Sequence, residues 1–394
     1  MSDSVKRVSV LQFSPHNENC GVGKYQENFM GEYGRGQLED IQTDFFDASP
    51  YQTRVMTQSE LDGVLTRLRE KLAGYDILHI QHEFGLFTGD EFAQIVDAAA
   101  SLGKKIVVTV HLSPALAFKS QPREGIGPRS LIHVARQKRL HGIFKQRHIE
   151  AFHKADLLIT HNDGATRSLE SYGIDRSHIL QFFHPVLGEI KTDIVSTELS
   201  ESLNKQPGDV LYATVGYMHR YKGTEDAVRA LKFLPSNYKL AIIGGTQPVS
   251  EDGNLYNKIA TLVDALGLHE RVYITGYVED DARMNALIRE ADICVYPYDN
   301  TYYGQVSSGA LNLSFANDRP VIAYPTDSFK ECNQEFHQIV MTNAFAYYEL
   351  AREIKRLDTE KQRAAIRLYA DKYSWRNTAE VVAGAYRELV GGRA

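Results

Sequence analysis

The sequence has little cysteine and no long apolar stretch. Its 394 residues include three cysteines, Cys20, Cys294 and Cys332, without pairing or metal-ligand spacing. We interpret them as cytosolic thiols and expect neither disulfides nor a metal site. The N-terminal sequence MSDSVKRVSVLQFS has no apolar run long enough for a signal peptide or a membrane span. We therefore expect a cytoplasmic protein.

A strong excess of one charge sign is also missing. The formal net charge of −6 gives no reason to expect nucleic acid as the main partner. A hydrophobic content of 43% and a charged content of 24% are typical of a soluble globular protein. Because 394 residues exceed one ordinary core, the length predicts two domains.

Short apolar runs alternate with amphipathic stretches along the chain. In the first half we predict strands at Val8–Phe13, Ile77–Gln81, Ile106–His111, Leu157–His161 and Ile179–Phe183. Helical patterns lie between them, for example over Gln58–Ala73 and Glu91–Leu102. This alternation predicts a parallel sheet that is covered on both faces.

The alternation stops at residues 189–208, a polar stretch ending in Pro-Gly that we interpret as an interdomain linker. It then restarts, with strands predicted at Val210–Val215, Leu240–Ile243, Val272–Thr275, Ile293–Tyr296 and Val321–Ala323. An amphipathic helix, about Trp375–Val390, closes the chain. The sequence thus predicts an α/β protein with two doubly wound domains, 1–188 and 209–374, that face a cleft.

The segment VGYMHRYKG, residues 215–223, follows a predicted strand and precedes a predicted helix. In open parallel sheets, ligands bind outside the carboxyl ends of the strands. Gly216 permits a tight turn, and His219, Arg220 and Lys222 bring polar or cationic groups to a helix N-terminus. The pattern favours an anion site, most naturally for a diphosphate; a solvated basic turn is the alternative.

The segment that follows the predicted strand Ile293–Tyr296 contains a long uncharged stretch. The segment YYGQVSSGALNLSFAN, residues 302–317, contains no charged side chain. At the mouth of its predicted helix stand Ser307, Ser308, Gly309 and Ala310. The backbone N–H groups of the last three are expected to bind phosphate or sugar hydroxyl oxygens. A helix that is merely capped by serine is the alternative.

Taken together and in this order, the segments resemble the GT-B-fold glycosyltransferases, and most closely the retaining glycosyltransferase family 4 (glycosyl transferases group 1). The resemblance covers essentially the full length. Its segments are NCGVGKYQENF, DILHIQHEFGLF, IVVTVHLSP, ADLLITHNDGATRSLESYGI, GYMHRYKG, AIIGG, VYITGYVEDDARMNALIREADICVYPY, SSGALNLSFANDRPVIA and YSWRNTAEVVAGAYREL. The resemblance implies two Rossmann-like domains, for acceptor and donor, and a C-terminal segment, 375–394, that crosses back to the first domain.

The resemblance also implies roles for single residues. Lys222, with Arg220 nearby, should neutralise the donor diphosphate, and His111 should contact the transferred sugar. Gly21 and Gly23 should let the first loop approach the phosphates or the acceptor. For His111, a strand-end histidine satisfied by backbone groups is the alternative.

Further positions are implied for the donor and the acceptor. The implied donor site comprises Gly216, Tyr277, Val278, Gln305, Ser307, Ser308, Gly309 and Ala310. His82 and Glu83 should line the acceptor side, with a purely structural role as the open alternative. The family often has arginine where this chain has Tyr217, so Arg220 is the expected substitute.

The chain departs from the family at two positions. Many members carry two glutamates eight positions apart, one for the donor hexose and one for the ribose. Those positions fall on Gln305 and Leu313. The Gln305 amide can still bond sugar hydroxyls because it both donates and accepts, whereas Leu313 cannot hold a ribose diol.

The expected reaction is transfer of a hexose, of mannose or glucose type, from a GDP- or UDP-linked sugar to an acceptor hydroxyl with retention. Neither a metal nor a protein nucleophile is expected, and the adjacent acids of EDDARM, residues 279–284, fit a helix N-terminus. Polysaccharide, glycolipid or glycoconjugate biosynthesis is the expected setting. The alternatives are an inactive sugar-nucleotide-binding subunit and a GT-B epimerase or hydrolase, for which Glu83 is one candidate acid or base.

The segment Lys119–Lys154 is basic, with nine Lys or Arg residues against two acids, Glu124 and Glu150. His133, His141, His148 and His153 are expected to add charge at lower pH, and apolar residues are interleaved. Such a stretch predicts contact with the inner face of an anionic membrane, at about 1 kcal/mol per basic residue, and a lipid-linked acceptor. A site for a phosphorylated acceptor and a helix pair facing the core are the alternatives.

Overall fold

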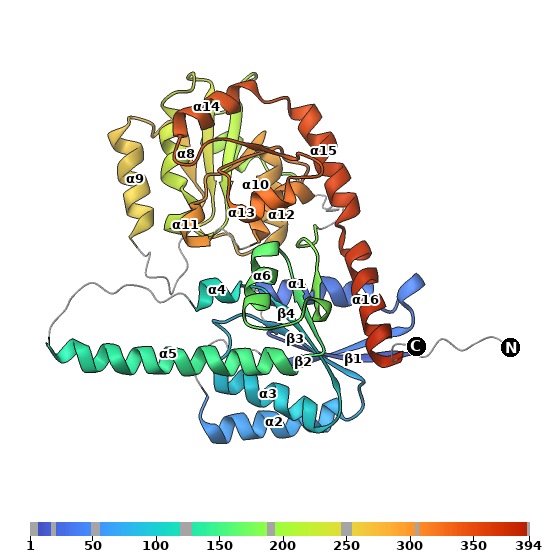
Figure 1. Ribbon diagram of the computed structural model, residues 1–394. Coiled ribbons are helices and arrows are strands. Elements are labelled where there is room, and N and C mark those ends of the chain that lie inside the picture. The colour runs from blue at the N-terminus through green and yellow to red at the C-terminus, as the bar shows by residue number, and fades with distance from the viewer. Residues whose placement is uncertain are drawn as a thin grey trace. The chain divides into compact units, whose positions relative to one another are not determined.

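The computed structural model (Figure 1) describes residues 7–16, 21–48, 56–118, 128–186, 194–245, 254–303 and 307–391. Of residues 128–138 and 302–303 only the backbone is described. The chain divides into two compact units. Unit 1 comprises Met1–Phe183 and Trp375–Ala394, and unit 2 comprises His184–Ser374.

Unit 1 contains a six-stranded sheet of order β2-β1-β3-β4-β5-β6, in which every described pair is parallel. The strands are β1 (Val8–Ser14), β2 (Ile41–Asp47), β3 (Ile77–His82), β4 (Lys105–Val110), β5 (Leu157–Thr160) and β6 (Ile179–Gln181). The helices are α1 (Gly21–Glu32), α2 (Gln58–Leu72), α3 (Gly89–Ser101), α4 (Pro114–Ala117), α5 (Pro128–Lys154), α6 (Asp163–Ser171) and α16 (Trp375–Gly391).

Unit 2 repeats this architecture with the order β12-β11-β10-β7-β8-β9, again parallel throughout the described pairs. Its strands are β7 (Val210–Val215), β8 (Tyr238–Ile243), β9 (Val272–Ile274), β10 (Ile293–Tyr296), β11 (Val321–Ala323) and β12 (Ile339–Met341). Its helices are α7 (Glu198–Ser202), α8 (Thr224–Leu231), α9 (Leu255–Ala265), α10 (Asp281–Glu290), α11 (Asn300–Tyr303), α12 (Gly309–Ala316), α13 (Asp327–Cys332), α14 (Tyr347–Arg356) and α15 (Thr359–Lys372). The predicted doubly wound α/β class is confirmed.

The sequence pattern missed one strand in each sheet, β2 and β12. Both lie at a sheet edge. In β2, IQTDFFD, only Ile41 and Phe46 are buried, and β12 has three residues of which only the first is fully buried. Both strands therefore lack the continuous apolar run by which buried parallel strands are recognised.

The last helix, α16, belongs to unit 1 although the whole of unit 2 precedes it in the chain. It packs against α1 and β1 and buries Trp375 and Tyr386. The Arg387 guanidinium forms a bidentate pair with the Asp40 carboxylate, with both N–O distances 2.7 Å. This pairing holds the pKa of the Asp40 carboxyl below its ordinary value. The predicted return of the C-terminal helix to the first domain is confirmed.

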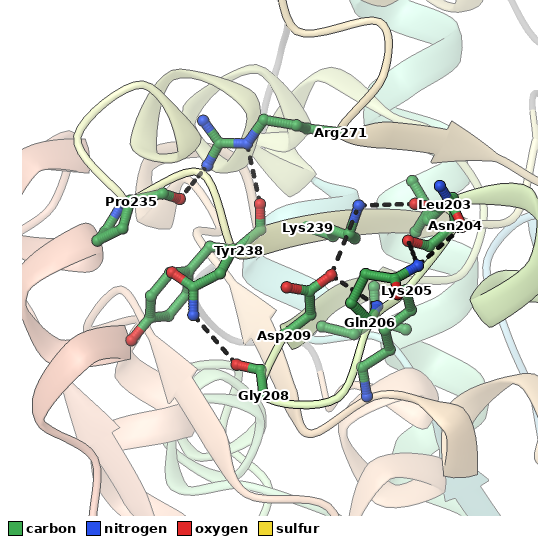
Figure 2. Close-up of polar contacts among 12 residues, drawn as sticks. Leu203, Asn204, Lys205, Gln206, Gly208, Asp209, Pro235, Tyr238, Lys239 and Arg271 are labelled. Carbon is green, nitrogen blue, oxygen red and sulfur yellow. Dashed lines mark hydrogen bonds and ion pairs between the residues drawn. The ribbon is translucent and has the colours of Figure 1, made fainter.

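Most of the stretch 194–208 packs as part of unit 2, whereas residues 189–193 lie outside the described residues. The Glu290 carboxylate accepts hydrogen bonds from the backbone N–H groups of Leu199 and Ser200 at the start of α7. Figure 2 shows how Lys239 holds the following turn by donating to the Leu203 carbonyl at 2.6 Å.

Arg271 ties together the amino-terminal edge of the unit 2 sheet. Its guanidinium donates to the backbone carbonyls of Tyr238 at 3.0 Å and Pro235 at 2.7 Å (Figure 2). Tyr238 opens β8, so this polar cluster lies at the sheet edge opposite to the carboxyl ends. It supports the fold and leaves the ligand-binding edge to other residues.

Glycines let three neighbouring loops of unit 2, after β7, β8 and β10, approach one another. A Cβ atom on Gly244 would lie 2.2 Å from the Gly216 carbonyl oxygen. Gly223, the residue before α8, has φ +63° and would bring a Cβ to 2.0 Å from the Pro297 carbonyl oxygen. The loop before α8 therefore requires glycine for both its conformation and its contacts.

We expect Gly223→Ala to destabilise unit 2 by more than about 3 kcal/mol, because the left-handed conformation and the collision with Pro297 act together. Gly267→Ala is the matched control, since Gly267 has φ +66° and nothing within 4 Å of an added Cβ. It should cost only the conformational term, about 1–2 kcal/mol. Denaturant unfolding of both variants measures the difference, and equal losses would contradict the contact with Pro297.

Among the buried histidines of unit 1, His79, His82 and His148 have a clearly lowered pKa. The His82 ring is fully buried among aromatic rings, with centroids 4.4 Å from Phe92 and 4.7 Å from Phe84. Burial lowers the pKa of His79 to about 3 and that of His148 to about 4, and it holds the pKa of His82 well below its ordinary value. All three rings are therefore neutral in the folded protein at neutral pH.

We expect unit 1 to be acid-labile. Unfolded histidine titrates near pH 6.5. Below that pH the unfolded chain therefore binds protons at histidines that stay unprotonated in the folded unit. Stability is then complete above pH 6.5 and falls with decreasing pH, by up to about 1.4 kcal/mol per pH unit for each histidine, until the folded pKa is reached. Unfolding of unit 1 followed from pH 7 to pH 5 measures this.

His82→Phe is the test variant, because within the described part of the chain neither ring nitrogen of His82 has a hydrogen-bond partner. The phenylalanine should flatten the pH dependence. The control His178→Gln changes an exposed ring and should leave the dependence as it is. A His82→Phe variant with the parent's pH dependence would show that protonation of His82 does not destabilise the unit.

Candidate functional site

The loop after β7 brings a lysine amine against a glycine. Gly216 has φ +102°, and a Cβ atom placed on it would lie 2.8 Å from the Lys222 Nζ. Lys222 ends a short 3₁₀ turn, Arg220–Lys222, immediately before Gly223 and α8. Only glycine at position 216 leaves room for the amine in this position.

The Lys222 ammonium is partly buried beside aromatic rings. Its Nζ lies 5.3 Å from the ring centroid of Tyr298 and 6.0 Å from that of Tyr221. Burial lowers the pKa of Lys222. No carboxylate of the described residues lies within ion-pair distance of this ammonium. A cation that is taken from water without a counter-charge gains strongly from a bound anion.

The start of α12 meets the same loop. A Cβ atom on Gly216 would lie 3.5 Å from the Ala310 Cβ, so the glycine of one segment contacts the second segment directly. Ser308 is the N-cap residue, and its Oγ accepts a hydrogen bond from the Leu311 N–H at 3.2 Å. The serine cap considered above is therefore present, and it stands beside Lys222. Gly309 is exposed, with open space around its Cα.

Of the residues near α12 that the sequence analysis considered, some are described by the structure and one is not. Gln305 lies outside the described residues, so its expected contact with the hexose stays a prediction. Leu313 lies on α12 and is partly buried. Ser307 precedes the cap and is half-buried. The buried Tyr298 ring, which the sequence analysis did not single out, joins the two segments, since its hydroxyl lies 3.3 Å from the Ser308 Oγ and Lys222 lies over its ring.

A pair of tyrosines lies after β7 and β9. The rings of Tyr217 and Tyr277 are stacked, with centroids 5.7 Å apart and an interplanar angle of 10°. Tyr277 is 40% exposed, whereas Val278 is buried. An exposed stacked ring offers a flat surface for another planar group. Tyr217, which stands where the family often has arginine, thus supports a predicted donor residue.

Arg220 does not share the surroundings of Lys222. It is exposed and, with His219, lines a separate cavity of about 390 Å³ beside α8 and α9. Lys222 and Gly216 line a smaller pocket at the ends of β7 and β10. Lys222 is therefore the stronger candidate for contact with a diphosphate, and the joint action of Arg220 stays a prediction.

The acids at 279–284 behave as the sequence suggests. The Asp280 side chain accepts a hydrogen bond from the Arg283 N–H at 2.6 Å and caps α10. Among the described residues, no cluster of three or more His, Cys, Asp or Glu side chains could hold a metal ion.

In unit 1, His111 lies just beyond β4 and is fixed by a side-chain contact. Its Nε2 lies 2.9 Å from the Gln81 Oε1, and its ring meets the Tyr25 ring edge-on at 4.7 Å. Gly21 and Gly23 are not in a loop as expected: Gly21 opens α1 and Gly23 is buried inside it. Their proposed backbone approach to a ligand is limited to the first turn of that helix.

The two predicted acceptor-side residues differ. The Glu83 carboxylate accepts a hydrogen bond from the Gly85 N–H at 2.9 Å, and burial raises its pKa. A raised carboxyl pKa beside a strand end is typical of functional sites. The complete burial of His82 in the aromatic core favours the structural alternative for that residue.

The described part of the basic segment 119–154 forms one helix, α5, and not a helix pair. It packs against α3, with ion pairs from Arg147 to Asp90 at 3.0 Å and from Lys154 to Asp97. Because its pKa falls to about 4, His148 does not add the expected charge at mildly lower pH. In the described residues, no helix is both long and apolar enough to cross a membrane. Residues 119–127 lie outside the described residues.

The chain is similar to known proteins in both sequence and structure. The family model of glycosyl transferases group 1 matches residues 195–373. No curated protein sequence matches the chain. Among solved structures, a glycosyltransferase from Rickettsia africae is similar over 98% of this chain and 100% of its own, with a TM-score of 0.69 and 15% identity.

Two further structures show the same likeness. Anabaena HepE in complex with UDP has a TM-score of 0.66 and 13% identity, over 96% of this chain and 99% of its own. Sucrose-phosphate synthase from Thermosynechococcus elongatus has a TM-score of 0.64 and 16% identity, over 98% and 100%. The chain therefore has the GT-B fold of two Rossmann-like domains, and its second unit carries the match to glycosyl transferases group 1.

Proposed function

We propose that this protein transfers a hexose from a nucleoside diphosphate sugar to an acceptor hydroxyl, with retention at the anomeric carbon. The observation that carries the proposal is the Lys222 ammonium, which lies against Gly216 and beside the α12 N-terminus without a described carboxylate partner. The match of residues 195–373 to glycosyl transferases group 1 supports it.

The chemistry follows from the leaving group. As the glycosidic bond breaks, negative charge develops on the departing nucleoside diphosphate, and fixed cations and helix N-termini stabilise such charge. Lys222 supplies the cation, and the backbone N–H groups of Ser308, Gly309 and Ala310 supply the dipoles. We propose no metal and no protein nucleophile, so a phosphate oxygen of the donor accepts the proton of the acceptor hydroxyl.

The neighbours favour a uridine donor among the two expected bases. Anabaena HepE has been solved with UDP, with UDP and glucose, and with UDP-glucose. In this protein we propose that the base stacks on the exposed face of Tyr277, and the expected contacts of His111 and of Gln305 with the hexose stay part of the proposal. The sugar is of glucose or mannose type, and the setting is polysaccharide, glycolipid or glycoconjugate biosynthesis in the cytoplasm.

Helix α5 carries the residues that bear on the acceptor. Leu140 and Ile143 on α5 are 49% and 42% exposed, and Arg139 beside them is exposed as well. This part of α5 can touch an anionic bilayer, which suits a lipid-linked acceptor at the inner face of the membrane. The ion pairs of Arg147 and Lys154 with α3 reduce the charge that is available to a membrane.

The direct test incubates the protein with UDP-glucose, UDP-galactose, GDP-mannose and GDP-glucose, and measures both thermal stabilisation and release of nucleoside diphosphate. We expect the UDP-sugars to raise the melting temperature most and to release UDP slowly even without acceptor. Stabilisation without any release, across added acceptors, would instead indicate a sugar-nucleotide-binding subunit. Neither binding nor release with any donor would refute the proposed function.

Lys222→Ala should weaken donor binding or turnover by roughly 1.5–3 kcal/mol, which is the range of a charge-assisted interaction. Stability of the free protein should not fall, because the variant removes a partly buried cation that has no described counter-charge. Isothermal titration with UDP and steady-state kinetics measure the effect.

Lys258→Ala is the matched control, since Lys258 is exposed and lines the neighbouring cavity beside α9. It should leave UDP affinity and turnover unchanged. If Lys222→Ala binds and turns over the donor as the parent does, Lys222 does not contact the diphosphate.

A further inference from the structure

Four polar side chains are buried in the middle of the unit 1 sheet, where parallel strands usually carry aliphatic residues. They are Gln12 on β1, His79 and Gln81 on β3 and Thr109 on β4, with exposed fractions of 0%, 3%, 0% and 0%. Burying such groups costs stability unless each finds a hydrogen-bond partner. Their presence in three adjacent strands therefore needs an explanation beyond folding.

These side chains are connected to one another and to α16. The Tyr386 Oη lies 2.5 Å from the His79 Nδ1, and the His79 Nε2 lies 2.8 Å from the Thr109 Oγ1. The Gln81 amide continues the connection, with its Nε2 3.4 Å from the His79 Nε2 and its Oε1 2.9 Å from the His111 Nε2. We call the set Gln12, His79, Gln81, Thr109 and Tyr386 the His79 network.

Each ring nitrogen of His79 can donate or accept in these contacts, depending on the tautomer. His79 is neutral because burial lowers its pKa to about 3, so its ring carries one N–H. We assign the Thr109 hydroxyl, at 2.8 Å, as the donor to the His79 Nε2, with the Gln81 amide N–H at 3.4 Å as a weaker second donor; this assignment puts the ring proton on Nδ1, facing Tyr386. The Gln81 carbonyl oxygen then faces His111 and accepts from its Nε2–H.

His111 is thereby held as the Nε2–H tautomer, with Nδ1 as the acceptor nitrogen of the ring. Gln81, the Tyr25 ring and the His161 ring are among the buried groups that contact His111 at the carboxyl end of β4. A histidine set in this way accepts a hydrogen bond from a sugar hydroxyl and does not donate one. This step rests on the proposed function, in which His111 contacts the transferred hexose.

We infer that Tyr386, on the last helix of the chain, is a positioning residue for the transfer reaction, acting on His111 through His79 and Gln81. Tyr386 is fully buried, and Gln12 lies on its other side, with Nε2 3.4 Å from the Tyr386 Oη. The strands of unit 1 alone do not complete this network. It is complete only when α16 is in place against β1.

Tyr386→Phe is the first test, because phenylalanine keeps the ring against Tyr33 and His79 and removes only the hydroxyl. We expect kcat to fall roughly 2- to 12-fold, the equivalent of one buried hydrogen bond, with KM for the nucleotide sugar unchanged. Thr109→Val removes the other partner of His79 and should act in the same direction. It also serves as the second variant if Tyr386→Phe does not fold.

Tyr75→Phe is the matched control. The Tyr75 hydroxyl donates to the Asp44 carboxylate at 2.6 Å just before β3, so this variant also loses one tyrosine hydrogen bond in unit 1. It lies at the opposite end of the strand from His111. We expect it to change stability but not kcat. Both variants are measured beside the parent protein, which must be active. Equal kcat in Tyr75→Phe and Tyr386→Phe would then overturn the positioning role.

A readout without activity separates this inference from the proposed function. Nitrogen-15 NMR of histidine-labelled protein reports which ring nitrogen of His111 carries the proton, with His111→Gln assigning the signal. We expect Nε2–H in the parent and in Tyr75→Phe, and a mixture of tautomers in Tyr386→Phe and in Gln81→Leu. An unchanged His111 signal in Tyr386→Phe overturns the inference whether or not the parent transfers sugar. An inactive parent with the expected signals refutes only the proposed function.

Discussion

Parallel pairing of the strands is the constraint on which the rest of this structure depends. Because all strands of a sheet run in one direction, their carboxyl ends meet at one edge, and residues far apart in sequence become neighbours there. Gly216 and Ala310 are such a pair, since the loop after β7 and the start of α12 touch at that edge. Arg271, at the other edge, serves the fold alone.

Both units bury ionisable groups without a described counter-charge, but to different effect. In unit 1 the buried imidazoles of His79 and His82 are neutral at neutral pH, and we expect their burial to make the unit acid-labile. In unit 2 the buried group is Lys222. Burial lowers its pKa, but the ordinary pKa of lysine lies far above neutrality. A neutral ring organises its neighbours by hydrogen bonding, whereas an unpaired ammonium attracts an anion.

The sequence analysis placed several candidate residues in the segments that follow strands. Lys222, Ser308 and His111 lie in segments that follow apolar runs plain in the sequence, so their place beyond the carboxyl ends of strands could be predicted, whereas their contacts with a ligand stay predictions. His82 follows the same rule and is nonetheless buried among Phe84, Phe92 and Phe152. Whether a strand-end side chain turns outward depends on the helices that cover it, which no local pattern records.

The sequence by itself determined the α/β class, the repeated strand–helix alternation and the glycine and serine segments that end strands. These follow from local patterns, since burial on both faces demands continuous apolar strands and tight turns demand glycine. Only the tertiary structure decided that Tyr386 meets His79, that Tyr298 joins Lys222 to Ser308, and that β2 and β12 complete the sheet edges. Such contacts join residues that are distant in sequence, and their energy depends on packing that is formed only when the whole unit has folded.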